Sequence, residues 1–543
     1  MTTGQPTLST APEQRGPETG PRGDALAATA RGGVANLLGA GLAGIAGLGV
    51  TWLVARGLGA EQAGSFFAAT AAFTLVGGVA RLGTVTGLVY WPARLRALST
   101  PELIGACLRA ALPPVALAGC ALAALTFWLA PLVTPGYATP LRALAVFLPL
   151  AALADALLAA TRGYRQMRPT VLLEKITRPA AQLLLVFAVF LLPGAPVAYW
   201  GIAWALPFLP VCLIAAYLLR RASSPAAPLP AALLPAALLP GRSGISMESW
   251  AKISWISLIC RGPRGAAARG PRAAGAAGMG RRFWRFTAPR AFANVAQTAL
   301  QRIDVLLVAA LAGLAPAAAY SVAGRFVVVG QLANGAISQA VQPRLAESLA
   351  LGDISAARRL YRTATGWLIL TSWPLHLTVL QFAGDYLALF GAHYRQAAPV
   401  VRVLALAMLL ATGCGMVDMV LAMGGRTVWN LVNVVVALAA MVTVDLLLIP
   451  TRGIFGAAIG LACAVAANNL LPLAQIVVKM RLHPFGGDTL AAALLTLVSF
   501  GAVPAALHAS PPWLAIGAGA TAYLLGVVLL RRRLPLTPLA RRV

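Results

Sequence analysis

Long apolar runs recur along the whole chain, and short polar segments separate them. A window of about 19 residues places these runs near residues 32–55, 64–91, 104–130, 142–161, 170–192, 199–219, 286–312, 320–342, 361–383, 398–422, 430–449, 454–478, 490–508 and 512–530. Each run is long enough to cross a hydrocarbon core of about 30 Å as a tilted helix. The ten-residue alternation of a membrane β-barrel is absent. The pattern predicts an all-α polytopic membrane protein with about fourteen transmembrane helices.

Polar and low-complexity segments divide these helices into two lobes. Six predicted helices precede a stretch rich in Pro, Ala, Gly and Arg, and eight follow it. Such a composition is typical of a disordered tether. We therefore expect a disordered cytoplasmic arm at 1–30, a six-helix lobe at 31–219, a basic cytoplasmic linker at 220–285, a second six-helix lobe at 286–478, two extra helices at 479–530 and a basic tail at 531–543.

The two lobes look like repeats of one another. RGGVAN at 31–36 opens the first helix much as RAFAN at 290–294 opens the seventh, and GLGAEQAGSFFAATAAF at 57–73 then aligns with GLAPAAAYSVAGRF at 313–326. Six helices separate the two openings, so both start on the same side and the repeat is parallel. Two facing lobes predict a central chamber that opens to either side by rocking.

Composition and charge support a membrane location. Apolar residues make up 59% of the chain, charged residues 11%, and the mean hydropathy is +0.79, which leaves too little polar surface for a soluble globule. The net charge of +28 lies in short segments between apolar runs, which favours anionic phospholipid headgroups over nucleic acid as partner. Alternating assignment puts 35 of the 43 lysines and arginines on one side, which predicts two cytoplasmic termini in a bacterial inner membrane.

The chain lacks sequence motifs typical of nucleotide-binding and metal-binding proteins, or carries them in an unsuitable structural context. GAGLAG at 39–44 fits a dinucleotide-binding pattern, but it lies inside an apolar helix without a preceding strand, so close helix packing explains it better. The chain has no phosphate-binding P-loop, and its six cysteines and four histidines are scattered. We expect no cofactor, no metal and no enzymatic activity, although a polytopic lipid-sugar transferase stays open as an alternative.

Charges inside the apolar runs are the candidates for function. A charge in hydrocarbon costs on the order of 3 kcal/mol on insertion scales, so such residues usually face a bundle interior or a wet path. Arg81, Arg302 and Arg325 are candidate substrate-binding residues, because a guanidinium grips phosphate with two hydrogen bonds. Asn36 and Asn294, at matching places in the repeats, are further candidates.

Carboxylates in the spans are candidates for ion coupling. Asp304, Asp155 and Asp418 could carry protons if buried, and Arg325 could pair with Asp304 across neighbouring helices. Plain structural explanations compete with these roles. Arg302 and Asp304 could anchor a helix end at the headgroups, Arg81 could form an ion pair with a neighbouring carboxylate, and Asp155 and Asp445 could be satisfied polar contacts.

The opening VANLLGAGLAGIAGLGVTWLVARGLGAEQAGSFFAATAAF resembles polysaccharide-repeat-unit (Wzx-like) flippases of the multidrug/oligosaccharidyl-lipid/polysaccharide exporter superfamily. The likeness lies in the Asn of the first helix, the L-G-x-E-x-x-G turn and the aromatic residues after it, and it extends to Asp304 and Arg325 in the second half. The resemblance implies an inner-membrane flippase that moves an undecaprenyl-diphosphate-linked oligosaccharide outward through a chamber lined with cationic residues.

The sequence therefore favours a flippase for a lipid-linked anionic saccharide, working by alternating access in cell-surface polysaccharide synthesis. Its expected partners are anionic phospholipids, and a polysaccharide polymerase or glycosyltransferases are further candidates. Two alternatives stay open within the superfamily: an ion-coupled multidrug exporter and a cell-wall precursor flippase.

Overall fold

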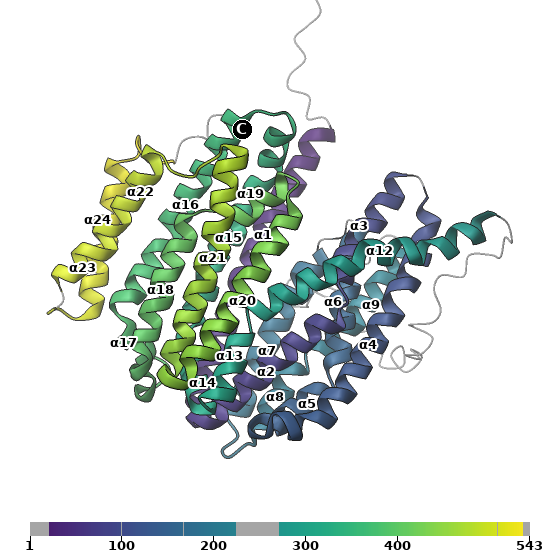
Figure 1. The fold of residues 1–543 in the computed structure, drawn as a ribbon, viewed down its shortest axis with the longest axis horizontal. Helices are drawn as coiled ribbons and strands as arrows, with labels where there is room; N and C mark the ends of the chain where they lie inside the picture. The colour runs from purple at the N-terminus through teal and green to yellow at the C-terminus, as the bar shows by residue number, and fades with distance from the viewer. Residues whose placement is uncertain are drawn as a thin grey trace, which may run out of the picture.

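A computed structural model describes residues 21–98, 100–164, 166, 168–223, 271–507 and 509–535, with side chains from Gly39 in the first helix and from Gly278 in α12. Within these residues all regular structure is helical. Figure 1 shows the helices as two bundles with α12 crossing between them and a smaller group, α22 to α24, at the edge. The all-α, two-lobe prediction is confirmed. Most of the predicted linker, 224–270, lies outside the described residues.

The first lobe contains helices of unequal length. They are α1 (Pro21–Gly57), α2 (Ala60–Ala80), α3 (Thr84–Ala97), α4 (Ile104–Val133), α5 (Ala138–Ala145), α6 (Leu148–Gly163), the π-helical η3 (Thr170–Thr177), α7 (Arg178–Phe190), α8 (Val197–Ala205) and α9 (Phe208–Ser223), with 3₁₀ turns η1 (Pro101–Leu103) and η2 (Pro135–Tyr137). α1 starts at Pro21, earlier than the predicted start of the first lobe at residue 31.

The second lobe and the edge group follow. They comprise α12 (Pro271–Leu300), α13 (Ile303–Leu311), α14 (Leu314–Ala323), α15 (Arg325–Ala350), α16 (Ile354–Gln381), α17 (Ala383–Ala388), the 3₁₀ turn η6 (Ala392–Ala397), α18 (Ala398–Gly413), α19 (Val417–Met423), α20 (Thr427–Arg452), α21 (Ile454–Met480), α22 (Gly487–Leu497), the π-helical η7 (Val498–Ala502), α23 (Val503–Ala506) and α24 (Pro512–Leu529).

Not every predicted span meets a strict test of length and apolarity. In the described part of the chain nine helices are long and apolar enough to cross a membrane, or ten when the bent pair α5–α6 is one span. The predicted spans at 170–192, 286–312, 320–342 and 361–383 are mostly helical but are not among the helices that meet this test. The chain is thus a multi-pass membrane protein, while the number fourteen stays a prediction. Helices too polar to face lipid are suited to line the inside of a bundle.

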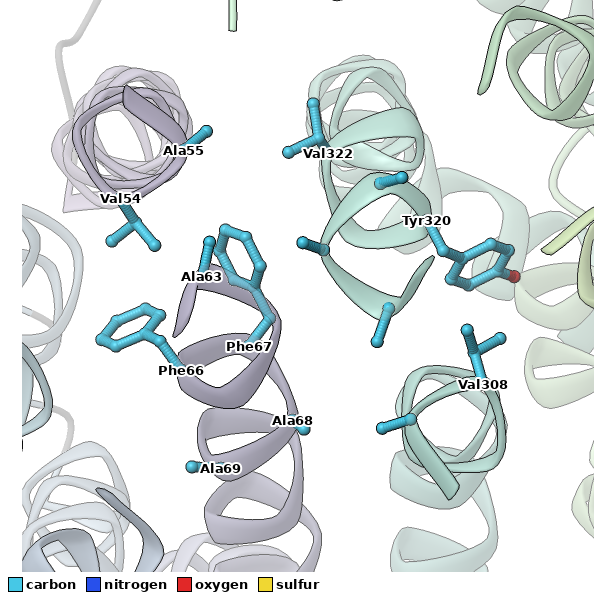
Figure 2. Packing of buried hydrophobic residues seen from close by; sticks show 14 of the residues in the cluster. Val54, Ala55, Ala63, Phe66, Phe67, Ala68, Ala69, Val308, Tyr320 and Val322 are labelled. Atoms are coloured by element: carbon cyan, nitrogen blue, oxygen red, sulfur yellow. The ribbon is translucent and has the colours of Figure 1, made fainter. Parts of the chain in front are cut away.

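The largest hydrophobic cluster of the described residues joins the two lobes. One large cluster combines Phe66 and Phe67 of α2 with Ala318 and Val322 of α14. Figure 2 shows Phe66 and Phe67 on one helix and Val322 on a neighbouring one. Two further clusters each belong mainly to one lobe: one joins α3, α4, α6 and α9 with the start of α12, and the other joins α15, α16, α19 and α21. The lobes are therefore packed together at the end that holds the start of α2 and α14.

Close backbone approach and hydrogen bonds strengthen this packed end. A Cβ atom on Gly64 would lie 1.8 Å from the carbonyl oxygen of Leu314, so only glycine lets α2 and α14 approach this closely. The indole of Trp52 donates to the Leu389 carbonyl oxygen at 2.9 Å, and the Arg56 guanidinium donates to the same oxygen at 3.1 Å. Under the predicted orientation this end faces outward.

Helix α12 belongs to the second lobe in sequence but packs on both lobes. Near its start, Phe286 stacks on Tyr90 of α3 with ring centroids 4.2 Å apart, and the Trp284 indole donates to the Ala110 carbonyl oxygen of α4 at 3.2 Å. Near its end, Leu300 joins Met441 of α20 in a separate apolar cluster. α12 thus bridges the lobes, as Figure 1 shows.

Candidate functional site

The three predicted arginines all lie where a helix is interrupted. Arg81 is the residue at the end of α2, and Arg302 immediately precedes α13. Arg325 begins α15 directly after the bend at Gly324. Leu82 and Gly83, which follow Arg81, have positive φ angles of 48° and 69°, so the chain turns sharply there. Broken helices mark binding sites in many transporters, because their free backbone groups need polar partners.

Arg81 lies in a cationic site in the first lobe. Its Nη1 is 3.1 Å from Asp155 Oδ2 in α6, and Arg178 Nη1 at the start of α7 is 3.8 Å from Asp155 Oδ1. The Arg81 side chain is 30% exposed and that of Asp155 is 21% exposed. One carboxylate therefore neutralises only one of two guanidiniums, and the group keeps a net positive charge. We call Arg81, Asp155 and Arg178 the inner arginine site.

This arrangement settles one alternative and reveals a residue that the sequence reading missed. The predicted ion pair between Arg81 and a neighbouring carboxylate is formed, and Asp155 is a satisfied polar contact. Arg178 was not among the candidate site residues, and it follows the π-helical η3 directly. π-Helical turns occur frequently at functional sites. The sequence signal that could have identified Arg178 is its position, as a charged residue, inside the predicted span 170–192.

In the second lobe, Asp304 is buried and bound within its own bundle. Its Oδ2 accepts a hydrogen bond from the Tyr320 hydroxyl at 2.9 Å, and its Oδ1 accepts one from the Val305 backbone N–H at 2.8 Å. The predicted pair between Arg325 and Asp304 is not formed, because Tyr320 occupies the carboxylate instead. Tyr320 was not singled out by the sequence.

A second buried carboxylate faces the same region. Asp445 of α20 has no exposed surface and interacts electrostatically with both Asp304 and Tyr320. Among the described residues neither of its carboxylate oxygens has a hydrogen-bond partner. The alternative that Asp445 is a satisfied polar contact is therefore wrong. No group of three or more His, Cys, Asp or Glu side chains in the described ranges has a metal-binding arrangement.

Arg325 and Arg302 lie close to this region without a carboxylate partner within 4 Å in the described part of the chain. The Arg325 guanidinium carbon lies 5.7 Å from the ring centroid of Phe67, across the interface with α2. The buried Nε atoms of Arg302 and Arg325 donate no hydrogen bond to any described residue. Arg325 therefore lies beside the first lobe while Arg302 interacts with Asp304, and we call these two residues the outer arginines.

The inner arginine site and Arg325 lie at different levels along α2. Phe67, which contacts Arg325, is fourteen residues before Arg81. At 1.5 Å per residue this separation is about 21 Å, roughly two thirds of a hydrocarbon core.

The other predicted site residues are placed apart from these groups. Asn294 is exposed on α12, and its backbone carbonyl accepts from the Thr298 hydroxyl at 2.8 Å. Asp418 is exposed on α19. The side chain of Asn36 lies outside the described residues.

Comparison with known proteins agrees with this architecture. Residues 289–448, which include the outer arginines, Asp304 and Asp445, match the MatE family. No curated protein sequence matches the chain.

Solved structures match over most of the chain. The lipid II flippase MurJ in an inward closed conformation superposes with a TM-score of 0.65 at 11% identity, covering 92% of this chain and 99% of that protein. An inward-facing multidrug resistance MATE family transporter of the MOP superfamily superposes with a TM-score of 0.59 at 13% identity, covering 83% and 98%. A MOP superfamily transporter from Pyrococcus furiosus has a TM-score of 0.52 at 14% identity, covering 84% and 95%. The chain therefore carries a MatE segment at residues 289–448 and has the two-lobed fold of MOP superfamily transporters.

Proposed function

We propose that this protein is an alternating-access flippase that moves a polyprenyl-diphosphate-linked oligosaccharide across the bacterial cytoplasmic membrane for cell-surface polysaccharide synthesis. The observation that carries this proposal is the inner arginine site, in which two arginines share a single carboxylate. A diphosphate offers several acceptor oxygens to such a pair and supplies the missing negative charge. Asp155 then acts as a positioning residue that holds both guanidiniums in place.

The packed end of the lobes supports an inward-facing resting state. With both termini in the cytoplasm, as the charge distribution predicts, α2 and α14 close the outer end through the Gly64–Leu314 contact. The inner arginine site then lies nearer the cytoplasmic side, where the lipid-linked precursor is made. Arg325 lies against Phe67, about 21 Å further along α2, and receives the diphosphate when the lobes rock.

Ion coupling belongs to the second lobe in this proposal. Asp304 and Asp445 are buried on α13 and α20, and the carboxylate oxygens of Asp445 have no hydrogen-bond partner among the described residues, so this pair is the candidate site for a coupled proton or small cation. Asp155 forms ion pairs with Arg81 and Arg178 and is not part of this coupling site. Asp418 stays a candidate proton carrier.

The test uses a strain that depends on this protein for its surface polymer. Arg81→Gln with Arg178→Gln removes both guanidiniums of the inner arginine site, and we expect polymer to fall at least about tenfold, since two charge-assisted hydrogen bonds are lost. Arg109→Gln, which changes an exposed arginine in α4, is the matched control. Normal polymer from the double variant at equal protein level would overturn the assignment.

The buried carboxylates favour one second candidate, an ion-coupled exporter of organic cations. Such an exporter would depend on Asp304 and Asp445 but not on Arg81 and Arg178. A cell-wall precursor flippase shares the diphosphate chemistry, so loss of viability instead of loss of polymer in the arginine variant would identify it.

A further inference from the structure

A second cationic cluster lies away from the inner arginine site and the outer arginines, where α16, α21 and the start of α22 meet. The Arg358 Nη2 donates to the backbone carbonyl oxygen of Arg481 at 2.7 Å. The Arg362 Nη2 lies 2.9 Å from His483 Nε2, and Gly486 lies directly against the Arg362 side chain. We call Arg358, Arg362, Arg481 and His483 the junction cluster.

The junction cluster has no negative counterpart in the described part of the chain. The ion pairs formed by the described residues involve Asp155 and Asp385, both elsewhere. The Nε atoms of Arg358 and Arg362 are buried and donate no hydrogen bond to a described residue. Arg481 adopts a positive φ of 55°, an uncommon backbone conformation for a residue other than glycine. The fold therefore holds two guanidiniums and an imidazole together, with no carboxylate of the described residues within 4 Å.

The position of the junction cluster indicates where its counterion comes from. Arg481 directly follows α21, one of the helices able to cross a membrane, so the cluster lies at headgroup level. The adjacent Phe485 side chain is 56% exposed, as expected for an apolar group that enters lipid. Arg531, Arg532 and Arg533 follow α24 and are exposed, and the next residue, Leu534, packs on Leu370 of α16. Figure 1 shows α16 and α22 side by side.

We propose that the junction cluster binds the phosphate of an anionic phospholipid from the inner leaflet, and that this lipid ties the edge helices α22 to α24 to the second lobe. Guanidiniums bind phosphate through short, charge-assisted hydrogen bonds, and a negatively charged headgroup neutralises the cluster without burying a carboxylate. The site is independent of transported substrate.

The experiment measures binding of phosphatidylglycerol to the purified full-length protein by titration in native mass spectrometry. Arg358→Gln with Arg362→Gln should weaken binding by on the order of tenfold, as expected for the loss of one or two charge-assisted hydrogen bonds. Arg359→Gln is the matched control, because Arg359 is exposed on the same helix and donates to the Ser355 hydroxyl. Arg358→Lys with Arg362→Lys keeps the charge and should retain binding within a few-fold, which separates loss of charge from misfolding.

Two further ligands identify the source of the phosphate. Phosphatidylcholine, which has no net charge, should bind the wild-type protein more weakly than phosphatidylglycerol. Inorganic phosphate should not displace phosphatidylglycerol. Equal affinity of the Gln variant and wild type would overturn the site, and displacement by inorganic phosphate would overturn its assignment to lipid.

Discussion

The carboxylate of Asp155 interacts with two arginines, so replacing it should reduce the stability of the protein. Asp155→Asn leaves Arg81 and Arg178 repelling one another in a half-buried site, and we expect a lower unfolding temperature. Arg81→Gln combined with Asp155→Asn should recover part of the loss, because only one charge then remains. Residues in one ion-pair network couple by about 0.5–3 kcal/mol. Thermal unfolding of the wild type, both single variants and the double variant gives this coupling; strictly additive effects would show that the contact contributes nothing.

At the scale of the single residue, the sequence identified charges but not their partners. Arg81 and Asp155 were both singled out, yet they lie 74 positions apart, and no local pattern shows that α2 and α6 bring them together. Arg178 was not singled out, because no local pattern shows that the start of α7 lies beside Asp155 of α6. Asp304 accepts a hydrogen bond from Tyr320, whereas Arg325 lies over Phe67 of α2, and neither contact is visible in the sequence.

Among the elements, α16 provides a pH-dependent test. The Asp353 carboxylate accepts from the Ala356 backbone N–H at 2.9 Å and from the Ser355 hydroxyl at 2.8 Å, and these bonds lower the pKa of Asp353. A lowered pKa means that the cap stabilises the helix above the ordinary carboxyl pKa and is lost as the pH falls through the folded value. The first turn of α16 should therefore exchange amide hydrogens faster below about pH 4.

Hydrogen exchange of a peptide that covers 354–361 measures this effect. Asp353→Asn keeps a capping side chain that does not titrate in this range, so its exchange, corrected for the intrinsic pH dependence, should change little. The same acid-induced loss of protection in the Asn variant would contradict the role given to Asp353.

The sequence predicted the strongly apolar helices well and the polar ones poorly. α20 and α21 appear at the predicted places because uninterrupted apolar runs leave little choice in a membrane. α12, α13 and α15 differ from simple spans, since breaks and polar side chains interrupt their apolar runs. Hydropathy does not contain that information, so the breaks at Arg302 and Gly324 became visible only in three dimensions.

For the whole molecule, the contact between Gly64 and Leu314 decides which end of the lobes is closed. Gly64→Ala would place a methyl group 1.8 Å from a backbone oxygen that has little freedom to move, so α2 and α14 must separate. We expect a larger population with the outer end open. Pulsed electron paramagnetic resonance between spin labels at Leu132 and Leu447, both exposed, should show a longer distance.

Gly41→Ala is the control for this change, because a Cβ atom there meets no neighbour within 4 Å. Both variants must elute from size exclusion as the wild type does. An unchanged distance distribution in Gly64→Ala would mean that this contact does not hold the outer end closed.

In the proposed mechanism, Arg81 and Arg178 of the first lobe bind the diphosphate while the lipid crosses the membrane. The most direct measurement is flipping of a fluorescent polyprenyl-diphosphate saccharide in vesicles that contain the purified protein, followed by access of a quencher to the outer leaflet. We expect wild type and Arg109→Gln to flip the lipid, and Arg81→Gln with Arg178→Gln to fall at least about tenfold. Equal flipping by the double variant and wild type, or flipping of a saccharide lipid without the diphosphate at the same rate, would contradict the account.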